Sequence, residues 1–167
     1  LKPSEHTPNT SRLIKKIVEK VFPVELMSVI EGDSKTASKL LEKKWDYIFF
    51  TGSVKVGEIV AIAAAKKLTP YTLELGGKSP AIINSDTDLK LASKRIVWGK
   101  FLNSGQTCVA PDYLVVHKSI KGTLIKELIN RIEKTFGKQL EKTDDFTAIV
   151  NEKNFNRLIS LINKNNN

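Results

Sequence analysis

Two side chains in this sequence have the chemistry of a nucleophile and a general base, and each lies in a polar segment that contains glycine. Cys108, the only cysteine in 167 residues, follows the polar run at 103–107 and could attack an electrophilic carbon as a thiolate. Glu74 precedes Gly76 and Gly77, which leave its carboxylate room to move and to take a proton. A buried core cysteine and an exposed glutamate in a structural turn are the alternatives, and neither residue excludes them alone.

A third segment has the features of a phosphate-binding turn. An apolar run at 47–50 is followed by Gly52 and Ser53, and then by the start of a helical pattern. A helix N-terminus presents free N–H groups and the positive end of its dipole, which attract phosphate. Gly52 and Gly57 are spaced G-x-x-x-x-G, so the segment is neither the usual dinucleotide fingerprint nor a P-loop. The alternative is a plain strand-to-helix turn that Ser53 caps.

The composition narrows the class of protein. The net charge is +9, but the lysines are spread over several predicted helices without interleaved aromatic residues, so we expect no nucleic-acid partner. No apolar run approaches the roughly 18 residues that a membrane-spanning helix needs. A single cysteine rules out an intrachain disulfide and favours a reducing compartment, so we expect a cytoplasmic protein. Only His6 and His117 could serve a thiol hydrolase, which is a weak interpretation, and we predict no metal site.

Alternating strands and helices would position these residues, and this order predicts an α/β fold with a parallel sheet. We expect strands at 24–30, 47–50, 71–75, 81–84 and 113–117, with a turn-and-strand region at 144–151. We expect a first helix that begins after Pro8 and carries apolar residues as far as Val21, and further helices at 35–44, 56–64, 89–101, 124–136 and 155–162. Thr10 or Ser11 would cap the first helix, and Asp86 or Thr87 the fourth. Ligands of such folds bind at the carboxyl ends of the strands, where two of the three segments above are expected.

Four motifs in this order resemble the aldehyde dehydrogenase superfamily. They are Lys-Pro-Ser-Glu at 2–5, Phe-Thr-Gly-Ser at 50–53, Glu-Leu-Gly-Gly-Lys-Ser-Pro at 74–80 and Gly-Gln-Thr-Cys at 105–108. The continuation Cys-Val-Ala-Pro-Asp-Tyr at 108–113 is most similar to the class 3 and fatty aldehyde dehydrogenase branch. The separation of Glu74 and Cys108 also resembles that branch, and the resemblance runs over essentially the whole chain.

The resemblance implies an aldehyde dehydrogenase-like fold, with a partial NAD(P)-binding domain of the Rossmann type at 1–78 and part of an α/β catalytic domain at 79–167. It implies that the Cys108 thiolate attacks an aldehyde, that the thiohemiacetal is oxidised to a thioester, and that Glu74 activates the water that releases the acid. The Cys108 N–H would help to hold the oxyanion, and Lys78 would be structural. The residues implied to contact the cofactor are Lys2, Glu5, Gly52, Ser53, Gly57, Leu75 and Gly76.

The cofactor would be NAD or NADP, because Glu5 would repel a 2′-phosphate that Lys2 would tolerate. The resemblance also implies a central fragment of a longer enzyme: relatives carry an oxyanion-binding asparagine before the first motif and a ribose-binding glutamate after the last, and we find neither here. We expect a homodimeric parent that oxidises medium or long aliphatic or aromatic aldehydes, in the cytoplasm or anchored to an intracellular membrane by a C-terminal segment.

Two alternatives remain for the function. The chain alone could be a catalytically inactive nucleotide-binding or interaction module, since the two segments just named are not found in it. A relative that reduces acyl phosphates or oxidises a semialdehyde is disfavoured by the sequence at 110–113.

Overall fold

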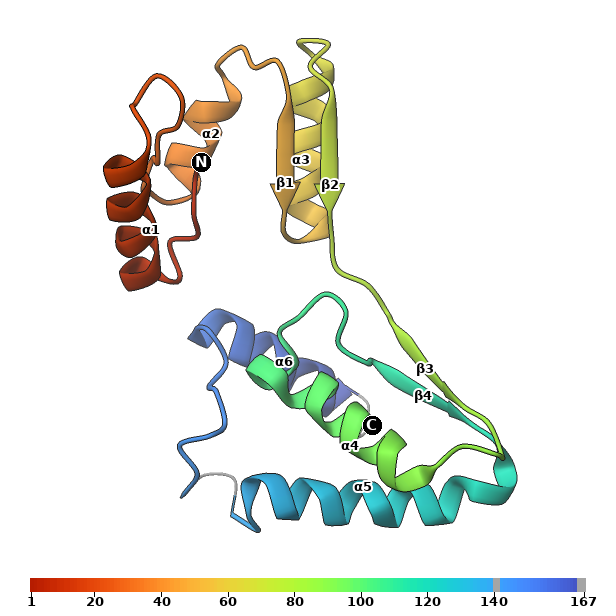
Figure 1. Ribbon diagram of the computed structural model, residues 1–167. Helices are drawn as coiled ribbons and strands as arrows, with labels where there is room; N and C mark the ends of the chain where they lie inside the picture. Colours follow the sequence, from red (N-terminus) through yellow and green to blue (C-terminus); the bar gives the residue numbers. More distant parts are fainter. Residues whose placement is uncertain (140–141, 165–167) are drawn as a thin grey trace. The chain divides into compact units, whose positions relative to one another are not determined.

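The chain divides into two compact units, Leu1–Leu75 and a second that begins at Gly76. The structure is a computed structural model that describes residues 1–139 and 142–164 (Figure 1). Each unit contains one pair of parallel strands together with several helices, which confirms the predicted α/β class. None of the helices in the described ranges is both long and apolar enough to cross a bilayer.

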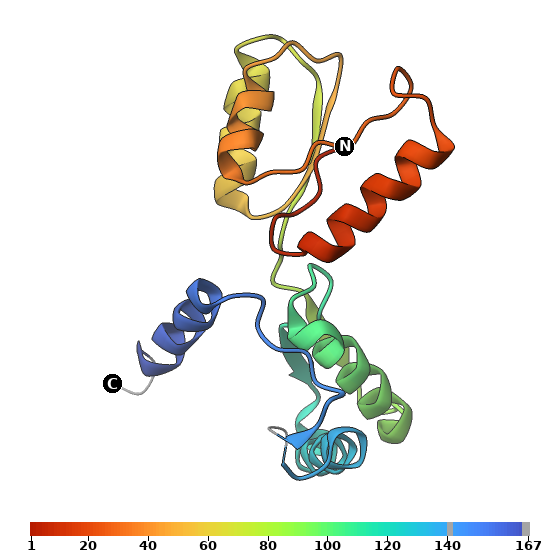
Figure 2. The ribbon, with the colours of Figure 1, turned by 90° about the vertical axis from the view of Figure 1, so that its left-hand side faces the viewer.

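The first unit is a strand–helix–strand motif extended by two helices. Its elements are α1 (Pro8–Val21), α2 (Ser34–Leu41), β1 (Ile48–Thr51), α3 (Val54–Ala65) and β2 (Tyr71–Glu74). β1 and β2 run parallel, with Ile48 opposite Tyr71 and Thr51 opposite Glu74. Parallel neighbours cannot be joined by a tight hairpin, and α3 supplies the crossover between them. Figure 2 shows α2 lying beside α3.

The core of this unit lies where α3 meets the strands. Val60 and Ala64 of α3 are only 4 % and 1 % exposed, and Gly57 is buried on the same helix. Burial of this apolar stripe stabilises α3 more than its intrinsic propensity does, because an isolated helix of this length is marginal in water. The unit is therefore held by the packing of its crossover helix, which also places the turn between β1 and α3.

The second unit pairs β3 (Pro80–Ile83) with β4 (Tyr113–Val116), again in parallel. Its other elements are α4 (Leu89–Phe101), the 3-10 turns η1 (Leu102–Gly105) and η2 (Lys118–Ile120), α5 (Lys121–Phe136) and α6 (Glu152–Lys164). α4 packs along α5, and here Val97 and Leu124 are 2 % and 1 % exposed.

A cluster of three phenylalanines closes one end of the second unit. The rings of Phe101, at the end of α4, and Phe136, at the end of α5, are 5.8 Å apart, and both contact the ring of Phe146. Edge-to-face arrangements of this kind are favourable beyond the area they bury. The cluster fixes the segment after Phe146 close to the point where α4 leads into η1.

The predicted strand at 24–30 is wrong, and so is the strand predicted within 144–151, although the turn predicted in that region is present at 144–145. At 24–30 the chain turns and then pairs with a single residue: the Leu1 ammonium donates to the Ser28 carbonyl at 2.8 Å, and the Ile30 N–H donates to the Leu1 carbonyl at 2.9 Å. At 144–151 several backbone groups bond instead to side chains of the loop around η1. An alternating apolar pattern indicates which side chains are buried, but it does not supply the neighbouring strand that a ladder needs.

Helix boundaries differ from the predictions by a few residues. α1 begins at Pro8, before both predicted caps, because proline suits the first helical position and lacks only an N–H that would be unpaired there. Asp33 caps α2, which ends at Leu41 rather than at 44. Asp88 caps α4 by accepting two backbone N–H bonds, just after the predicted positions. In both capped helices the carboxylate satisfies donors of the first turn.

Candidate active site

The carboxyl ends of β1 and β2 bring three of the predicted site residues together. Because Thr51 pairs with Glu74, the turn after β1 begins beside the end of β2, and the Gly52 N–H donates to the Glu74 carbonyl at 2.9 Å. Ser53 follows as the N-cap of α3, and its hydroxyl accepts the Val56 N–H at 3.4 Å. The Gly52–Ser53 turn and Glu74 therefore share one edge of the strand pair.

The N-terminus of α3 opens at this edge and suits an anion. N–H groups of the first helical turn point outward along the axis and carry the positive end of the helix dipole. The turn reads Val54, Lys55 and Val56, so its one charge is positive. An anion beside Ser53 would meet these N–H groups without a competing carboxylate from the turn itself.

Gly57 and Leu75 meet inside the first unit rather than at this edge. Gly57 is buried, and a Cβ at this position would lie 2.8 Å from Cδ2 of Leu75. The glycine therefore lets α3 approach β2 closely, and this packing sets where the α3 N-terminus lies. Gly76 differs, because a Cβ built there would meet no atom of the described residues within 4 Å. An added Cβ would therefore meet open space at Gly76 and the Leu75 side chain at Gly57.

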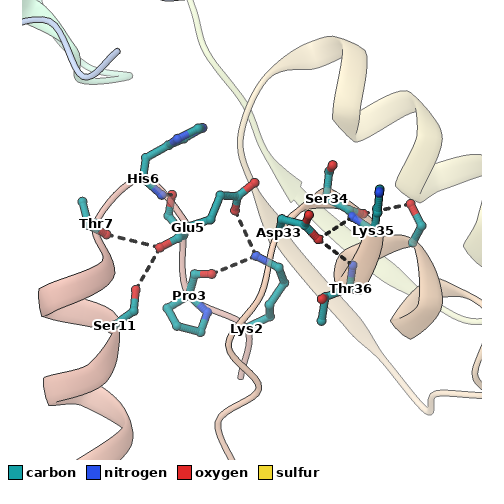
Figure 3. Close-up of polar contacts among 12 residues, drawn as sticks. Lys2, Pro3, Glu5, His6, Thr7, Ser11, Asp33, Ser34, Lys35 and Thr36 are labelled. Carbon is teal, nitrogen blue, oxygen red and sulfur yellow. Dashed lines mark hydrogen bonds and ion pairs between the residues drawn. The ribbon is translucent and has the colours of Figure 1, made fainter.

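Lys2 and Glu5 form an ion pair in the first unit, beside the N-terminus of α2 (Figure 3). The Lys2 ammonium lies 3.1 Å from Oε2 of Glu5 and also donates to the Pro3 carbonyl at 2.9 Å. A hydrogen bond from its own backbone N–H, together with the Lys2 ammonium, lowers the pKa of the Glu5 carboxyl below its ordinary value. Glu5 is therefore ionised at neutral pH, and its carboxylate can accept hydrogen bonds from hydroxyl groups.

Cys108 lies in an exposed loop of the second unit, between η1 and β4. The backbone that leads to it is left-handed at Asn103, Ser104 and Gly105, with φ values of 52°, 54° and 75°. Each of the two non-glycine residues costs about 1–3 kcal/mol in this conformation. The Ser104 hydroxyl donates to the Thr147 carbonyl, and this bond helps to offset the cost. The candidate nucleophile therefore follows a strained backbone segment, and contacts with neighbouring residues must stabilise that segment.

The side chain of Gln106 makes three hydrogen bonds that stabilise this segment. Its Nε2 donates to the Asn103 carbonyl at 3.0 Å and to the Ala148 carbonyl at 3.2 Å, while its Oε1 accepts the Val150 N–H at 2.8 Å. Both ends of one side-chain amide are therefore used on backbone groups. Sequence reasoning treated Gln106 only as part of a motif, because nothing in the sequence marks residues 148–150 as its partners.

A second segment contacts Cys108 from the glycine motif that follows β2. The Ser79 hydroxyl donates to the Cys108 carbonyl at 3.5 Å, and the Asp112 N–H donates to the Ser79 carbonyl at 2.8 Å. The Lys78 ammonium lies 3.3 Å from Oδ2 of Asp112. The cysteine loop is thereby tied to residues 78–79 as well as to 147–150.

Apart from Gly57, Leu75 and Gly76, the predicted site residues fall into three groups, two in the first unit and one in the second. Glu74 belongs with Gly52 and Ser53 at the edge of β1 and β2, and Lys2 with Glu5. Cys108 belongs to the second unit, where its neighbours are Ser79 and the loop around η1.

Comparison with known proteins identifies the family. Residues 1–167 match the model of the aldehyde dehydrogenase family. The chain is 47 % identical over 163 residues to 4,4'-diaponeurosporen-aldehyde dehydrogenase of Staphylococcus aureus, covering 98 % of this chain and 36 % of that protein. It is 44 % identical to the mouse "Aldehyde dehydrogenase, dimeric NADP-preferring", covering 97 % of this chain and 36 % of that protein. The chain belongs to the aldehyde dehydrogenase family.

Solved structures agree with this assignment. The substrate-bound Staphylococcus aureus AldH superposes with a TM-score of 0.87 at 47 % identity, over 97 % of this chain and 35 % of that one. An NAD-dependent aldehyde dehydrogenase from Sinorhizobium meliloti gives a TM-score of 0.86 at 31 % identity, over 98 % of this chain and 33 % of that one. The fold is that of aldehyde dehydrogenases, and the chain spans about a third of the length of these relatives.

Proposed function

We propose that the protein containing this chain oxidises an aldehyde to a carboxylic acid with NAD⁺ or NADP⁺. The proposal is carried by the shared edge of β1 and β2, where a turn suited to phosphate at Gly52–Ser53 lies beside Glu74. Membership of the aldehyde dehydrogenase family supports the reaction class. The first unit would then belong to the cofactor domain predicted at 1–78, and the second to the catalytic domain predicted at 79–167.

Residues of the first unit would hold the cofactor. Ser53 and the α3 N-terminus would bind the diphosphate, and the Lys2–Glu5 pair would bind the adenosine ribose. Gly76, the first residue of the second unit, would leave space for the nicotinamide, while Gly57 and Leu75 would act through packing. When bound, the nicotinamide supplies the acceptor for the hydride that turns the thiohemiacetal into a thioester.

The charges of Lys2 and Glu5 act in opposite directions on the 2′-phosphate that distinguishes NADP from NAD. The ionised Glu5 would repel a 2′-phosphate, whereas the Lys2 ammonium would attract it. The relatives differ in the same respect, since the mouse protein is named NADP-preferring and the Sinorhizobium meliloti protein NAD-dependent.

Cys108 would form the covalent intermediate. Its exposure leaves the sulfur within reach of a substrate, and the thiolate would add to the aldehyde carbon to form a C–S bond. The carbonyl oxygen takes the negative charge, and the Cys108 backbone N–H would donate to it. The loop bonds made by Ser104 and Gln106 would hold that N–H in place.

Glu74 would act in the release of the acid. Its carboxylate would take a proton from a water molecule whose oxygen adds to the thioester carbon. The C–S bond then breaks, the carboxylic acid leaves, and the Cys108 thiolate is restored. The exposed side chain at the end of β2 and its neighbouring glycines leave the carboxylate the freedom that this role needs.

The substrate would be a medium or long aliphatic or aromatic aldehyde, and the assembled enzyme a homodimer in the cytoplasm. Relatives named family 3 aldehyde dehydrogenases support the branch, and the mouse relative is named as dimeric. The single cysteine among these residues favours a reducing compartment. For the 167-residue chain alone, an inactive nucleotide-binding or interaction module is the second candidate, because it spans only 36 % of its relatives.

The deciding experiment replaces Cys108 in the complete protein that carries this sequence. We expect Cys108→Ala to lower NAD(P)-dependent aldehyde oxidation by about 10⁴-fold or more, as removal of a covalent nucleophile does elsewhere. Reduced nicotinamide is measured by absorbance, and cofactor binding by fluorescence quenching, which should stay unchanged. Full aldehyde oxidation by Cys108→Ala would overturn the proposal.

A further inference from the structure

Gln106 is the best-connected side chain of the loop that carries Cys108. One amide bonds three backbone groups, of Asn103, Ala148 and Val150, at distances of 2.8–3.2 Å. Two of these groups lie more than forty residues further along the chain. The side chain is half-buried, so these bonds are partly shielded from competing water. Gln106 therefore joins two distant segments rather than stabilising its own turn alone.

The pattern of donors and acceptors requires an amide at this position. Two carbonyl oxygens face the Nε2 group and one N–H faces Oε1, so the side chain must donate twice and accept once. A carboxylate would set negative oxygen against two carbonyls, and an apolar side chain of equal length would leave all three groups without this partner. The site thus distinguishes glutamine from both isosteres.

The hydrogen bond that Cys108 itself accepts is weaker than those of Gln106. The bond from the Ser79 hydroxyl to the Cys108 carbonyl is 3.5 Å long, at the outer limit of a hydrogen bond. The backbone at Asn103 and Ser104 is left-handed, so it tends to relax when its support is removed. Gln106 lies two residues before Cys108 in the chain, and its three hydrogen bonds are shorter than the bond from Ser79.

We propose that Gln106 is a positioning residue for Cys108: its amide, bound to residues 148 and 150, sets the place of the nucleophile and of its backbone N–H. The inference rests on the proposed function of Cys108 and adds a residue that acts through it. A purely structural Gln106 would affect how much protein folds, but not the turnover of each folded molecule.

The test compares Gln106→Met and Gln106→Glu with the parent in the complete protein. Gln139→Met, at an exposed position of the same unit, is the matched control. Four quantities are measured: thermal stability, the fraction of Cys108 alkylated by iodoacetamide and located by peptide mass spectrometry, kcat per alkylatable Cys108, and KM for aldehyde and cofactor. The methionine variant introduces no charge, so an effect common to both variants is not electrostatic.

We expect both variants to lower kcat per Cys108 by about 10²-fold, which is the effect of moving a reacting group by roughly 1 Å. In both variants the KM for the cofactor should stay at the parent value, and the rate of Cys108 alkylation should change. The control variant should match the parent in all four quantities. Unchanged kcat per Cys108, or failure of both variants to fold, would assign Gln106 a structural role and overturn the inference. If Cys108→Ala itself keeps activity, the proposed function fails instead, and the alkylation rate still reports on the clamp.

Discussion

At the scale of single residues, Glu74 combines a fixed main chain with an exposed side chain. Its carbonyl accepts the Gly52 N–H at 2.9 Å, which anchors the end of β2 to the turn before α3. The carboxylate lies outside the core, next to a segment whose two glycines impose few rotational limits. This arrangement suits a base that must approach different groups during one reaction.

The proposed role of Glu74 as general base predicts a change in the kinetics of one step. Glu74→Gln should lower steady-state turnover by about 10²–10⁴-fold, because water attack on the thioester loses its base. Formation of the thioester precedes that step, so stopped-flow absorbance should still record a burst of one reduced nicotinamide per Cys108. Glu58→Gln, an exposed residue of α3, is the control and should keep parent rates. Loss of the burst as well would place Glu74 in an earlier step.

At the scale of elements, α3 links the core of the first unit to the candidate cofactor site. Its apolar stripe packs on the strands, and its first turn opens beside Ser53. Gly57 lies just after this first turn, and it lets the helix pack closely on Leu75, because a Cβ there would be 2.8 Å from Leu75 Cδ2. A shift of the helix would therefore move the N–H groups proposed to bind the diphosphate.

Substitutions at Gly57 should affect stability and cofactor binding together. Gly57→Ala should change stability by less than about 1 kcal/mol, because the gain in helix propensity offsets a small shift of the flexible Leu75 side chain. Gly57→Val adds volume against Leu75 and should cost about 1–3 kcal/mol, with weaker NAD(P) binding. Thermal unfolding and fluorescence titration measure the two effects. Gly122→Val, on α5 where a Cβ meets no described atom within 4 Å, should leave cofactor binding at the parent value.

At the scale of the whole molecule, large apolar side chains of both units are exposed. Phe49 of β1 is 67 % exposed, Ile82 of β3 is 78 % and Trp98 of α4 is 69 %. Exposed apolar surface of this kind marks faces that other protein segments cover, or sites of aggregation. The chain also spans about a third of the length of its relatives.

These exposed faces predict how the 167-residue chain behaves by itself. It should bind a dye specific for apolar surface and should form no measurable reduced nicotinamide with aldehyde and NAD(P)⁺. The complete protein carrying the same sequence is the comparison, and it should show the reverse on both measurements. Clear turnover by the isolated chain would rule out the inactive-module interpretation.

Local sequence patterns were sufficient to predict most of the helices and strands and to indicate the family. The apolar run at 47–50 and the strand at 71–75 are present within one residue of their predicted bounds, as β1 and β2. Periodic apolar residues marked the six α-helices of the described residues, and the motifs around Gly52, Glu74 and Cys108 indicated a family that the comparisons confirm. Side-chain pattern and turn chemistry act over a few residues, so a single sequence contains them.

Contacts between residues far apart in sequence were revealed only by the tertiary structure. The register that sets Thr51 opposite Glu74, the contact of Gly57 with Leu75 and the clamp of Gln106 on Ala148 and Val150 all join segments far apart in sequence. The predicted strands at 24–30 and within 144–151 failed for the same reason, because strand formation depends on a neighbour that local pattern does not specify. Backbone N–H and C=O groups pair with the segment that tertiary packing places beside them, and that segment depends on the fold as a whole.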